Sequence, residues 1–580
     1  MILHKAMGYK NRREFLQVAA AASTTIAALA HPMPRMLRGR EIGDPVIAAS
    51  QPQPTEHASV QASIRGVMVD AARVPESLDY YRRVIEFCSD WELNTLQFRL
   101  ADDQGTALRF SSVADLVTHP DAFTPAQLRS LGEYGKAHGV DLIPELESFG
   151  HTGYITRSPA YAHLLDREPQ GDEEFTGVIP VHPDTTELFK RLFREVAAIF
   201  PSRYLHGGCD EVNWGGSALS RKALQTKTRP QVWAEYLNEL NQSVEALGKQ
   251  FIVWGDFVVH KEPRILGQLN NNIIIMDWNY WDTNAAQFRD ALTAIEAGGH
   301  RGIGAPGLIS YRWGPRAGTK SLRNIDAFAD AYFAPDISGS LGVILTNWVP
   351  SRYIQNSIWD GFAYAAVAFK HGATTARESG HRRFVERHFR AQWNPVWSEA
   401  FQLIYEAAPT YGERDSLSSI GLRLPVPFSD EEHLAALLKN RPTGPNPFTR
   451  LRSLLVSLEP SIKKNHSDFR ALALSVEYLE AMFWRESVIF EHAAGKPVDS
   501  ESGRALIQSI AERDRRLLKV LSEDWDRGRS PQSAAKGGPL FGFAPKDQLL
   551  FQWQRAADFS ASLALHPDRF YGLLKANGLA

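Results

Sequence analysis

Between Ser63 and about Lys370, short apolar runs alternate with longer amphipathic stretches. The apolar runs are IRGVMVD, NTLQFRL, DLIPELES, RYLHGGCDE, FIVWGDF, NIIIMDWNY, GIGAPGLIS and LGVILTNW. Between them, stretches such as ESLDYYRRVIEFCSDW and DTTELFKRLFREVAAIF place apolar residues three and four positions apart, as in a helix with one buried face. Eight strands alternating with helices over about 300 residues predict an α/β fold, a parallel (β/α)8 TIM barrel.

A doubly wound open sheet is the alternative fold for the same alternation. Such sheets usually carry a glycine-rich phosphate loop after the first strand. The segment after the first run here is DAARVPES, which contains no glycine, so the barrel is favoured. Thr124 and Asp184 are placed to cap two helix N-termini, and Gly139 and Gly248 to follow two C-termini.

The pattern changes after Gly372, where strand-like runs vanish. Long helical stretches such as LRSLLVSLEPSIKKNHSDFRALALSVEYLEAMFWRESVIFEHA take over, interrupted by a Pro- and Gly-bearing loop near residues 441–446. A chain of 580 residues exceeds one typical domain. We therefore predict a catalytic barrel over residues 63–372 and an α-helical C-terminal domain over residues 373–580.

The N-terminus has the features of an export signal. Arg12 and Arg13 precede a mildly apolar run from Val18 to Ala30, which ends in the small-x-small pattern Ala-Leu-Ala. This predicts a twin-arginine signal peptide over residues 1–30, followed by a flexible Pro-, Ala- and Gln-rich linker over residues 31–62. A chance basic, alanine-rich helix is the alternative. The run is too weak for a stable membrane span, so we expect a periplasmic or secreted protein with no membrane partner after signal cleavage.

Composition excludes several classes of function. A formal net charge of −2 gives no electrostatic reason to expect a nucleic-acid partner. Two cysteines do not imply a disulfide framework. The spacing of His, Asp and Glu on any one element lacks a metal-ligand pattern, so we expect neither a metal nor a cofactor. The chain has 14 tryptophans, a residue type that often packs against sugar rings.

Polar and aromatic residues recur where the predicted strands end. In such barrels catalytic residues lie at the C-terminal ends of the strands, and the fourth run ends on the adjacent carboxylates Asp210 and Glu211. Neighbours on a regular strand point to opposite faces, but at a strand end both acids can reach one cavity. A solvated turn is the alternative for this pair. The other strand ends supply Arg73, Asp102, Asp103, Glu145, Glu147, His151, Trp254, Asp256, Trp278, Tyr280, Tyr311 and Trp348. Such a mouth suits an uncharged polyol, that is, a sugar.

The stretches RGVMVDAARV, NTLQFRLADDQG, LIPELESFGH, YLHGGCDEV and IVWGDF resemble those of glycoside hydrolase family 20, the β-N-acetylhexosaminidases, in order and strand position. ESFGH and HGGCDEV look most similar to the hexosaminidase D-like branch, which lacks the family's usual N-terminal accessory domain. The resemblance implies a retaining exo-glycosidase that removes terminal β-linked N-acetylhexosamine (GlcNAc or GalNAc) from glycans. Its partner is therefore a carbohydrate substrate, whose own 2-acetamido oxygen attacks the anomeric carbon and forms an oxazolinium intermediate.

The resemblance also assigns roles. Glu211 is the general acid and then the base, with a pKa brought near the working pH by partial burial among tryptophans. Asp210 stays ionised and accepts the acetamido N–H. Arg73 forks onto sugar hydroxyls, with a barrel-rim salt bridge as the alternative. The other implied binding residues are His151, bonded to Asp210 or a neighbour unless it is a plain structural histidine; Trp254, Trp278 and Trp348 as pocket walls or core; and Tyr280 or Tyr311, one of which bonds the acetamido oxygen.

Two departures from the family pattern leave questions open. Arg99 stands where the second strand usually has a histidine, so its hydrogen-bond network must differ. Val349 and Pro350 follow Trp348, where the family often has a glutamate that holds the outer hydroxyls, so GlcNAc-versus-GalNAc preference is undecided. Two other classes remain: a non-catalytic glycan-binding barrel, and a glycosidase for a non-acetamido sugar that uses Glu145 or Asp256 as a separate nucleophile.

Overall fold

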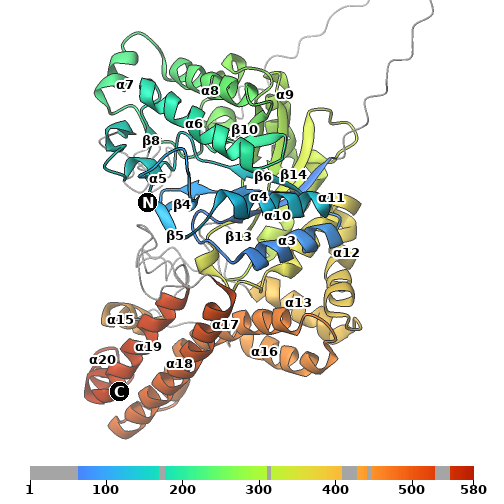
Figure 1. The fold of residues 1–580 in the computed structure, drawn as a ribbon. Helices are drawn as coiled ribbons and strands as arrows, with labels where there is room; N and C mark the ends of the chain where they lie inside the picture. The colour runs from blue at the N-terminus through green and yellow to red at the C-terminus, as the bar shows by residue number, and fades with distance from the viewer. Residues whose placement is uncertain (1–62, 169–176, 310–314, 408–426, 440–445, 530–548) are drawn as a thin grey trace, which may run out of the picture. The chain divides into compact units, whose positions relative to one another are not determined.

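A computed structural model of the chain describes residues 63–168, 177–309, 315–407, 427–439, 446–529 and 549–580 (Figure 1). Ser63–Ala580 forms one compact unit. The predicted signal peptide and linker, residues 1–62, lie outside the described residues, as does Tyr311. Within the described part, no helix is both long and apolar enough to cross a membrane.

Eight parallel strands form the barrel. In spatial order they are β1 (Ile64–Asp70), β2 (Thr95–Arg99), β6 (Asp141–Glu145), β9 (Tyr204–His206), β10 (Gln250–Trp254), β11 (Ile274–Trp278), β12 (Arg301–Ala305) and β14 (Ser340–Asn347). β14 pairs back onto β1, with Ile64 opposite Gly342, so the sheet is closed. The predicted (β/α)8 barrel is confirmed, and β1 begins and ends where its sequence pattern does.

Helices follow the strands around the barrel (Figure 1). They are α3 (Leu78–Asp90), α4 (Pro125–Ala137), α6 (Pro183–Ile199), α8 (Arg229–Glu245), α9 (Ala285–Ala297), α10 (Thr319–Tyr332) and α11 (Trp359–His371). Thr124 caps α4 as predicted, in a capping box with Gln127. The prediction that Asp184 caps α6 is wrong, because Pro183 occupies the first helical turn and the His182 side chain accepts from the Asp184 N–H instead.

The seventh predicted strand is interrupted. GIGAPGLIS forms β12 and a separate β13 (Gly307–Ile309), with Pro306 between them. Proline has no N–H to give to a sheet, while the Pro306 carbonyl still accepts from the Thr346 N–H at 2.8 Å. The chain therefore continues along β14 with a shifted register.

Shorter elements extend from the strand ends. β3 (Ala101–Asp102), β4 (Gly105–Leu108) and β5 (Thr118–Phe123) form a small sheet after β2. β7 (Leu165–Asp166) pairs with β8 (Gly177–Val178) in the long segment after β6, which also holds α5 (Gly153–Thr156). A π-helix, Asp256–Lys261, follows β10 directly. These insertions surround the end of the barrel at which the candidate residues lie.

The described residues after Gly372 are helical. They form α12 (Ala373–Phe384), α13 (Pro395–Ala407), α15 (Glu431–Lys439), α16 (Pro447–Leu458), α17 (His466–His492), α18 (Ser500–Gly528), α19 (Leu549–Leu565) and α20 (Pro567–Ala576). Most of the loop predicted near residues 441–446 lies outside the described residues. The boundary at residue 372 stays a prediction, since Ser63–Ala580 is a single compact unit.

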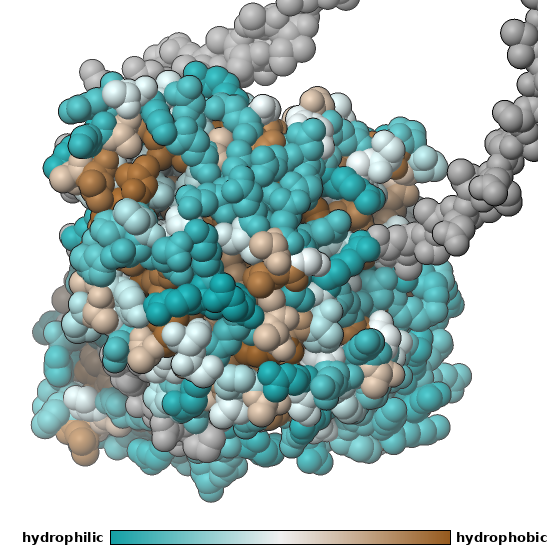
Figure 2. Space-filling view, turned by 45° about the horizontal axis from the view of Figure 1, so that its top comes forward, coloured by the Kyte–Doolittle hydropathy of each residue, from teal (hydrophilic) through white to brown (hydrophobic). Residues whose placement is uncertain are grey.

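Apolar side chains fill the barrel. Met68, Ile143, Ile252, Met276 and Ile344 belong to one buried cluster. At the ends of their strands the cluster continues into Trp254, Tyr280 and Trp348. On the face drawn in Figure 2, hydrophilic residues predominate and hydrophobic ones lie in small groups between them. The candidate site thus rests on a packed interior, as in other barrels of this kind.

Candidate active site

Asp210 and Glu211 reach one site because the chain leaves the strand geometry just before them. β9 ends at His206, and Gly208, Cys209 and Glu211 have φ angles of 67°, 75° and 47°. Left-handed backbone is costly for residues with a side chain and recurs at functional sites. At Gly208 a Cβ would overlap the Glu147 carboxylate, so this turn requires glycine. The alternation of a regular strand is therefore broken, as the adjacent acids require.

His151 joins the two acids. Its Nε2 lies 3.3 Å from Glu211 Oε2 and 3.8 Å from Asp210 Oδ2. Its Nδ1 lies 3.0 Å from Asp103 Oδ2, and its own φ is 48°. Burial lowers the pKa of His151, but the nearby Asp102 and Asp210 and the bonds to Asp103 and Glu211 outweigh it and raise that pKa well above its ordinary value. His151 therefore lies between carboxylates that favour its protonated form.

The environment of Glu211 differs from the expected one. Its side chain is 39% exposed, and its backbone N–H lies 3.3 Å from Asp256 Oδ2. Burial tends to raise the pKa of Glu211, but the hydrogen bond and charge of His151, with further contributions from Lys261 and Arg73, lower it below its ordinary value. The expectation is that burial among tryptophans brings the pKa of Glu211 toward neutrality; the pKa is lowered instead, because a cation faces the carboxylate.

Asp210 presents an unused acceptor. Its side chain is 8% exposed, and among the described residues its Oδ1 has no hydrogen-bond partner. A buried carboxylate oxygen without a donor is costly unless a ligand supplies one. Asp210 is thus suited to accept an N–H from a molecule bound at the barrel mouth.

Sequence reasoning identified Arg99 only as a replacement for a histidine and missed its ion pairs. Its fully buried guanidinium pairs with Asp102, with Glu145 at 3.0 Å and with Glu147 at 2.9 Å. Buried carboxylates need such pairing. The sequence signal for it is the pair Glu145 and Glu147, two residues apart where β6 ends. The structure places Arg99 opposite Glu145 in the β2–β6 register. Arg99 therefore replaces the expected histidine as the hub of a buried charge cluster.

Arg73 is fixed at the edge of the same cluster. Its Nη1 bonds Asp70 Oδ2 at 2.9 Å, and its Nη2 lies 3.0 Å from Asp102 Oδ2. The guanidinium also sits over the Trp348 ring, 5.4 Å from its centroid. The salt bridges predicted as the alternative for Arg73 are present. They hold the Arg73 guanidinium over the Trp348 ring.

The predicted aromatic residues form that wall. The Trp254 and Trp348 rings are 6.0 Å apart, and Trp278 stacks on Tyr280 at 5.2 Å. The Trp348 Nε1 donates to the Tyr280 hydroxyl at 2.8 Å, and the Trp254 Nε1 donates to Glu145 at 3.0 Å. These bonds fix the rings at the mouth of the barrel, with Tyr280 beside Trp348. Tyr311, the other candidate tyrosine, lies outside the described residues.

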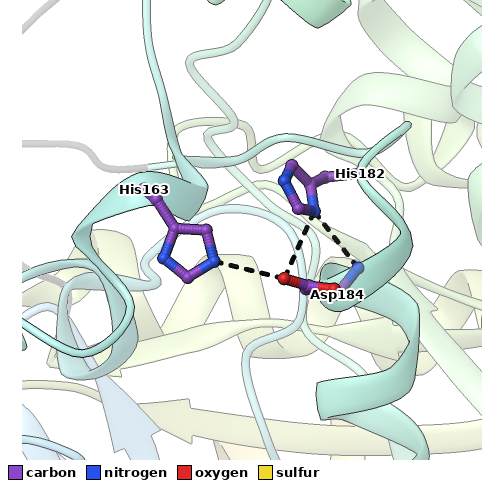
Figure 3. Close-up of side chains that lie close together, drawn as sticks. All are labelled: His163, His182 and Asp184. Atoms are coloured by element: carbon purple, nitrogen blue, oxygen red, sulfur yellow. Dashed lines mark hydrogen bonds and ion pairs between the residues drawn. The ribbon is translucent and has the colours of Figure 1, made fainter.

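One further cluster has metal-binding side chains, as Figure 3 shows. His163 Nε2 and His182 Nδ1 lie 3.4 Å and 4.0 Å from the Asp184 carboxylate, a donor set that suits zinc. However, the His182 Nδ1 lone pair already accepts from the Asp184 N–H at 3.1 Å. The positive end of the α6 dipole also disfavours a cation there. We interpret the cluster as a helix cap.

A parallel barrel with two adjacent acids, a bridging histidine and an aromatic wall at its mouth is an arrangement suited to binding a sugar beside an acid. Residues 63–311 match the family described as "Glycosyl hydrolase family 20, catalytic domain". The barrel of this chain is therefore similar to the catalytic domain of glycosyl hydrolase family 20.

Parts of the chain are similar to known proteins. A beta-hexosaminidase of Vibrio furnissii is 24% identical over 249 residues, covering 37% of this chain and 39% of that protein. A beta-N-acetylhexosaminidase of Cellulomonas fimi is 26% identical over 268 residues, covering 43% and 48%. The solved chitobiase of Flavobacterium johnsoniae is 16% identical with a TM-score of 0.45, covering 79% and 78% of the two chains. This chain thus spans less than half the length of these two curated relatives.

Replacing His151 by asparagine is expected to move the alkaline limb of the pH profile of kcat/KM to higher pH. The His151 charge lowers the pKa of Glu211, and a general acid loses activity as the pH rises through its pKa. Without that charge the pKa of Glu211 rises, and the protonated acid persists to higher pH. Profiles of wild type, His151→Asn and a His138→Asn control, which alters a histidine at the end of α4, measure the shift; an unmoved limb contradicts the assignment.

Replacing Arg73 by lysine is expected to lower kcat/KM about ten- to a hundredfold, because a charge-assisted pair contributes roughly 1.5–3 kcal/mol and a lysine lacks the planar fork. Steady-state kinetics on an acetamido glycoside measures the loss. The control is Arg82→Lys on α3, whose side chain is 40% exposed. Equal kinetics in the two variants would show that Arg73 serves the barrel rim alone.

Proposed function

We propose that this protein is a retaining exo-β-N-acetylhexosaminidase that removes terminal GlcNAc or GalNAc from glycans by substrate-assisted catalysis. The observation that carries the proposal is the shared environment of Asp210 and Glu211 around His151 at the barrel mouth. In the first step the acetamido oxygen bonds the anomeric carbon while the glycosidic bond breaks and Glu211 gives its proton to the leaving oxygen. Asp210 accepts the acetamido N–H and stabilises the charge on that nitrogen.

In the second step Glu211 takes a proton from water, which adds to the anomeric carbon as the oxazolinium ring opens. In both steps Glu211 must lie near the oxygen that leaves or attacks the anomeric carbon, and Asp210 must lie near the acetamido group. The strained turn that directs Asp210 and Glu211 to one histidine supports this division of roles.

The environment of Glu145 argues against it as a separate nucleophile. Glu145 is fully buried, its Oε1 accepts from Arg99 and Trp254, and its Oε2 accepts from Gln97 at 2.7 Å. A nucleophilic carboxylate needs a free oxygen near the anomeric carbon, and neither oxygen of Glu145 is free. Asp256 differs, because its Oδ2 is bound by Lys261 at 3.0 Å while its Oδ1 has no hydrogen-bond partner among the described residues. The hydrolysis of a plain glucoside therefore tests Asp256 as the alternative nucleophile.

The test is hydrolysis of aryl β-N-acetylglucosaminide, aryl β-N-acetylgalactosaminide and the plain β-glucoside side by side. We expect turnover of both acetamido sugars within about tenfold of each other, under 1.4 kcal/mol, because the loop after β14 has buried Val349 and Pro350 rather than a carboxylate. Turnover of the glucoside would contradict the mechanism. No turnover of any of them, with binding of N-acetylglucosamine, would indicate a glycan-binding barrel.

Export through the twin-arginine pathway to the periplasm or beyond is part of the same proposal. It is supported by the sequence of residues 1–30. Changing Arg12 and Arg13 together to lysine is expected to retain the protein in the cytoplasm with its signal uncleaved. Cell fractionation measures this, with general secretory-pathway mutants as the control. Periplasmic delivery of the double variant would overturn the assignment.

A further inference from the structure

The end of α18, far along the chain from the barrel strands, contacts two loops at the catalytic end of the barrel. Arg529 Nη2 donates to the carbonyls of Pro350 at 2.6 Å and Tyr353 at 3.0 Å, in the loop after β14. Its Nε lies 3.4 Å from Glu76 Oε2, in the loop after β1. The side chains of Arg529 and Glu76 are 1% and 2% exposed, so this ion pair is buried.

Gln355 closes the same network. Its Nε2 lies 2.7 Å from Glu76 Oε2 and 2.6 Å from the Gly528 carbonyl. A Cβ on Gly528 would overlap the Gln355 carboxamide and displace it, so glycine allows this close approach of α18. The backbones of Glu76 and Arg529 also form an isolated β-bridge. Two catalytic-face loops and the end of α18 are therefore one hydrogen-bonded unit.

These loops carry residues that line the proposed sugar site. Arg73 lies three residues before Glu76, and Trp348 lies two residues before Pro350. Val349, between Trp348 and Pro350, has a φ of 53°, and its N–H bonds Asp70 Oδ2 at 3.0 Å. Left-handed backbone at a β-branched residue persists where its surroundings over-determine it. The bonds from Arg529 to the next carbonyl supply part of that restraint.

We propose that Arg529 is a positioning residue that holds Arg73 and Trp348 in place to bind the sugar. Through it, the C-terminal helical region supports the substrate site by way of the loops after β1 and β14. This inference rests on the proposed function. Because the supported groups contact the sugar before and during the reaction, loss of Arg529 removes binding common to ground and transition states and raises KM.

The experiment compares Arg529→Met, Arg529→Lys, Glu76→Gln and the control Arg527→Met on an aryl β-N-acetylglucosaminide. Arg527 lies two residues away and its side chain is 69% exposed. Arg529→Met should raise KM about tenfold with kcat within about threefold, the signature of lost uniform binding. Arg529→Lys, which keeps the charge beside Glu76, should recover part of the loss. Arg527→Met should match wild type.

A fall in melting temperature with KM unchanged in Arg529→Met would show a structural role alone and overturn the proposal. If that variant does not fold, Glu76→Gln decides, since the substitution keeps the shape and removes the charge; an unchanged KM there overturns the proposal too. Failure of the proposed function shows differently, because wild-type enzyme would then not turn over the substrate.

Discussion

Replacing Glu211 by glutamine is expected to lower turnover of glycosides with poor leaving groups by about 10²–10⁴-fold, the usual contribution of a general acid. Glutamine keeps the shape of the side chain but has no proton to give to the leaving oxygen. An activated aryl leaving group departs without that proton, so the same variant should lose much less activity on it. The ratio of the two losses, not either alone, identifies the acid.

The control for this experiment is Glu187→Gln on α6, whose side chain is 69% exposed and lies away from the site. It should match wild type on both kinds of substrate. Circular dichroism of both variants checks that the fold is kept. Equal losses on poor and activated leaving groups would remove Glu211 from the acid role.

The barrel could be predicted from local sequence because its signal is repeated and local. Each strand is a short apolar run, and each helix has one apolar face, so β1 and the capping of α4 by Thr124 match the sequence pattern. The errors occur where one residue overrides the pattern. Pro306 lacks the N–H that would continue the seventh strand, and Pro183 moves the start of α6 ahead of Asp184.

The positions of the site residues could be predicted because barrel chemistry lies at strand ends. Their electrostatics could not, because these depend on contacts between strands. The low pKa of Glu211 requires His151 to lie within 3.3 Å, which depends on left-handed backbone at both residues. The role of Arg99 depends on three carboxylates, Asp102 in β3 and Glu145 and Glu147 at the end of β6, which the fold brings together.

The link between Arg529 and Glu76 was beyond sequence reasoning for a different reason. The two residues are hundreds of positions apart and neither belongs to a recognisable motif. Their burial as a charged pair is visible once the fold brings α18 to the loops after β1 and β14. Removing one partner of a buried ion pair leaves the other charge unpaired and is strongly destabilising. In related sequences we therefore expect Arg529 and Glu76 to be replaced together rather than singly.

Changing Asp210 to alanine is expected to lower kcat/KM about 10²–10³-fold even on an activated acetamido glycoside, the cost of losing a group that stabilises developing charge. A good leaving group does not help, because Asp210 acts on the nucleophile. Its Oδ1 is buried without a partner among the described residues, which suits it to accept the acetamido N–H of the proposed substrate. Asp210→Asn should lose nearly as much, since the amide keeps the size but not the charge.

Binding of an inhibitor separates this role of Asp210 from a structural one. A thiazoline inhibitor, which resembles the oxazolinium intermediate, should bind Asp210→Ala much more weakly than wild type, because the carboxylate stabilises the positive nitrogen in both. The Glu211→Gln variant should bind it with a smaller loss, since Glu211 acts on the leaving oxygen. The two adjacent acids therefore have opposite fingerprints: loss of Glu211 depends on the leaving group, and loss of Asp210 depends on the acetamido group. Near-normal activity of Asp210→Ala on an activated acetamido glycoside would show that the substrate's own oxygen is not the nucleophile.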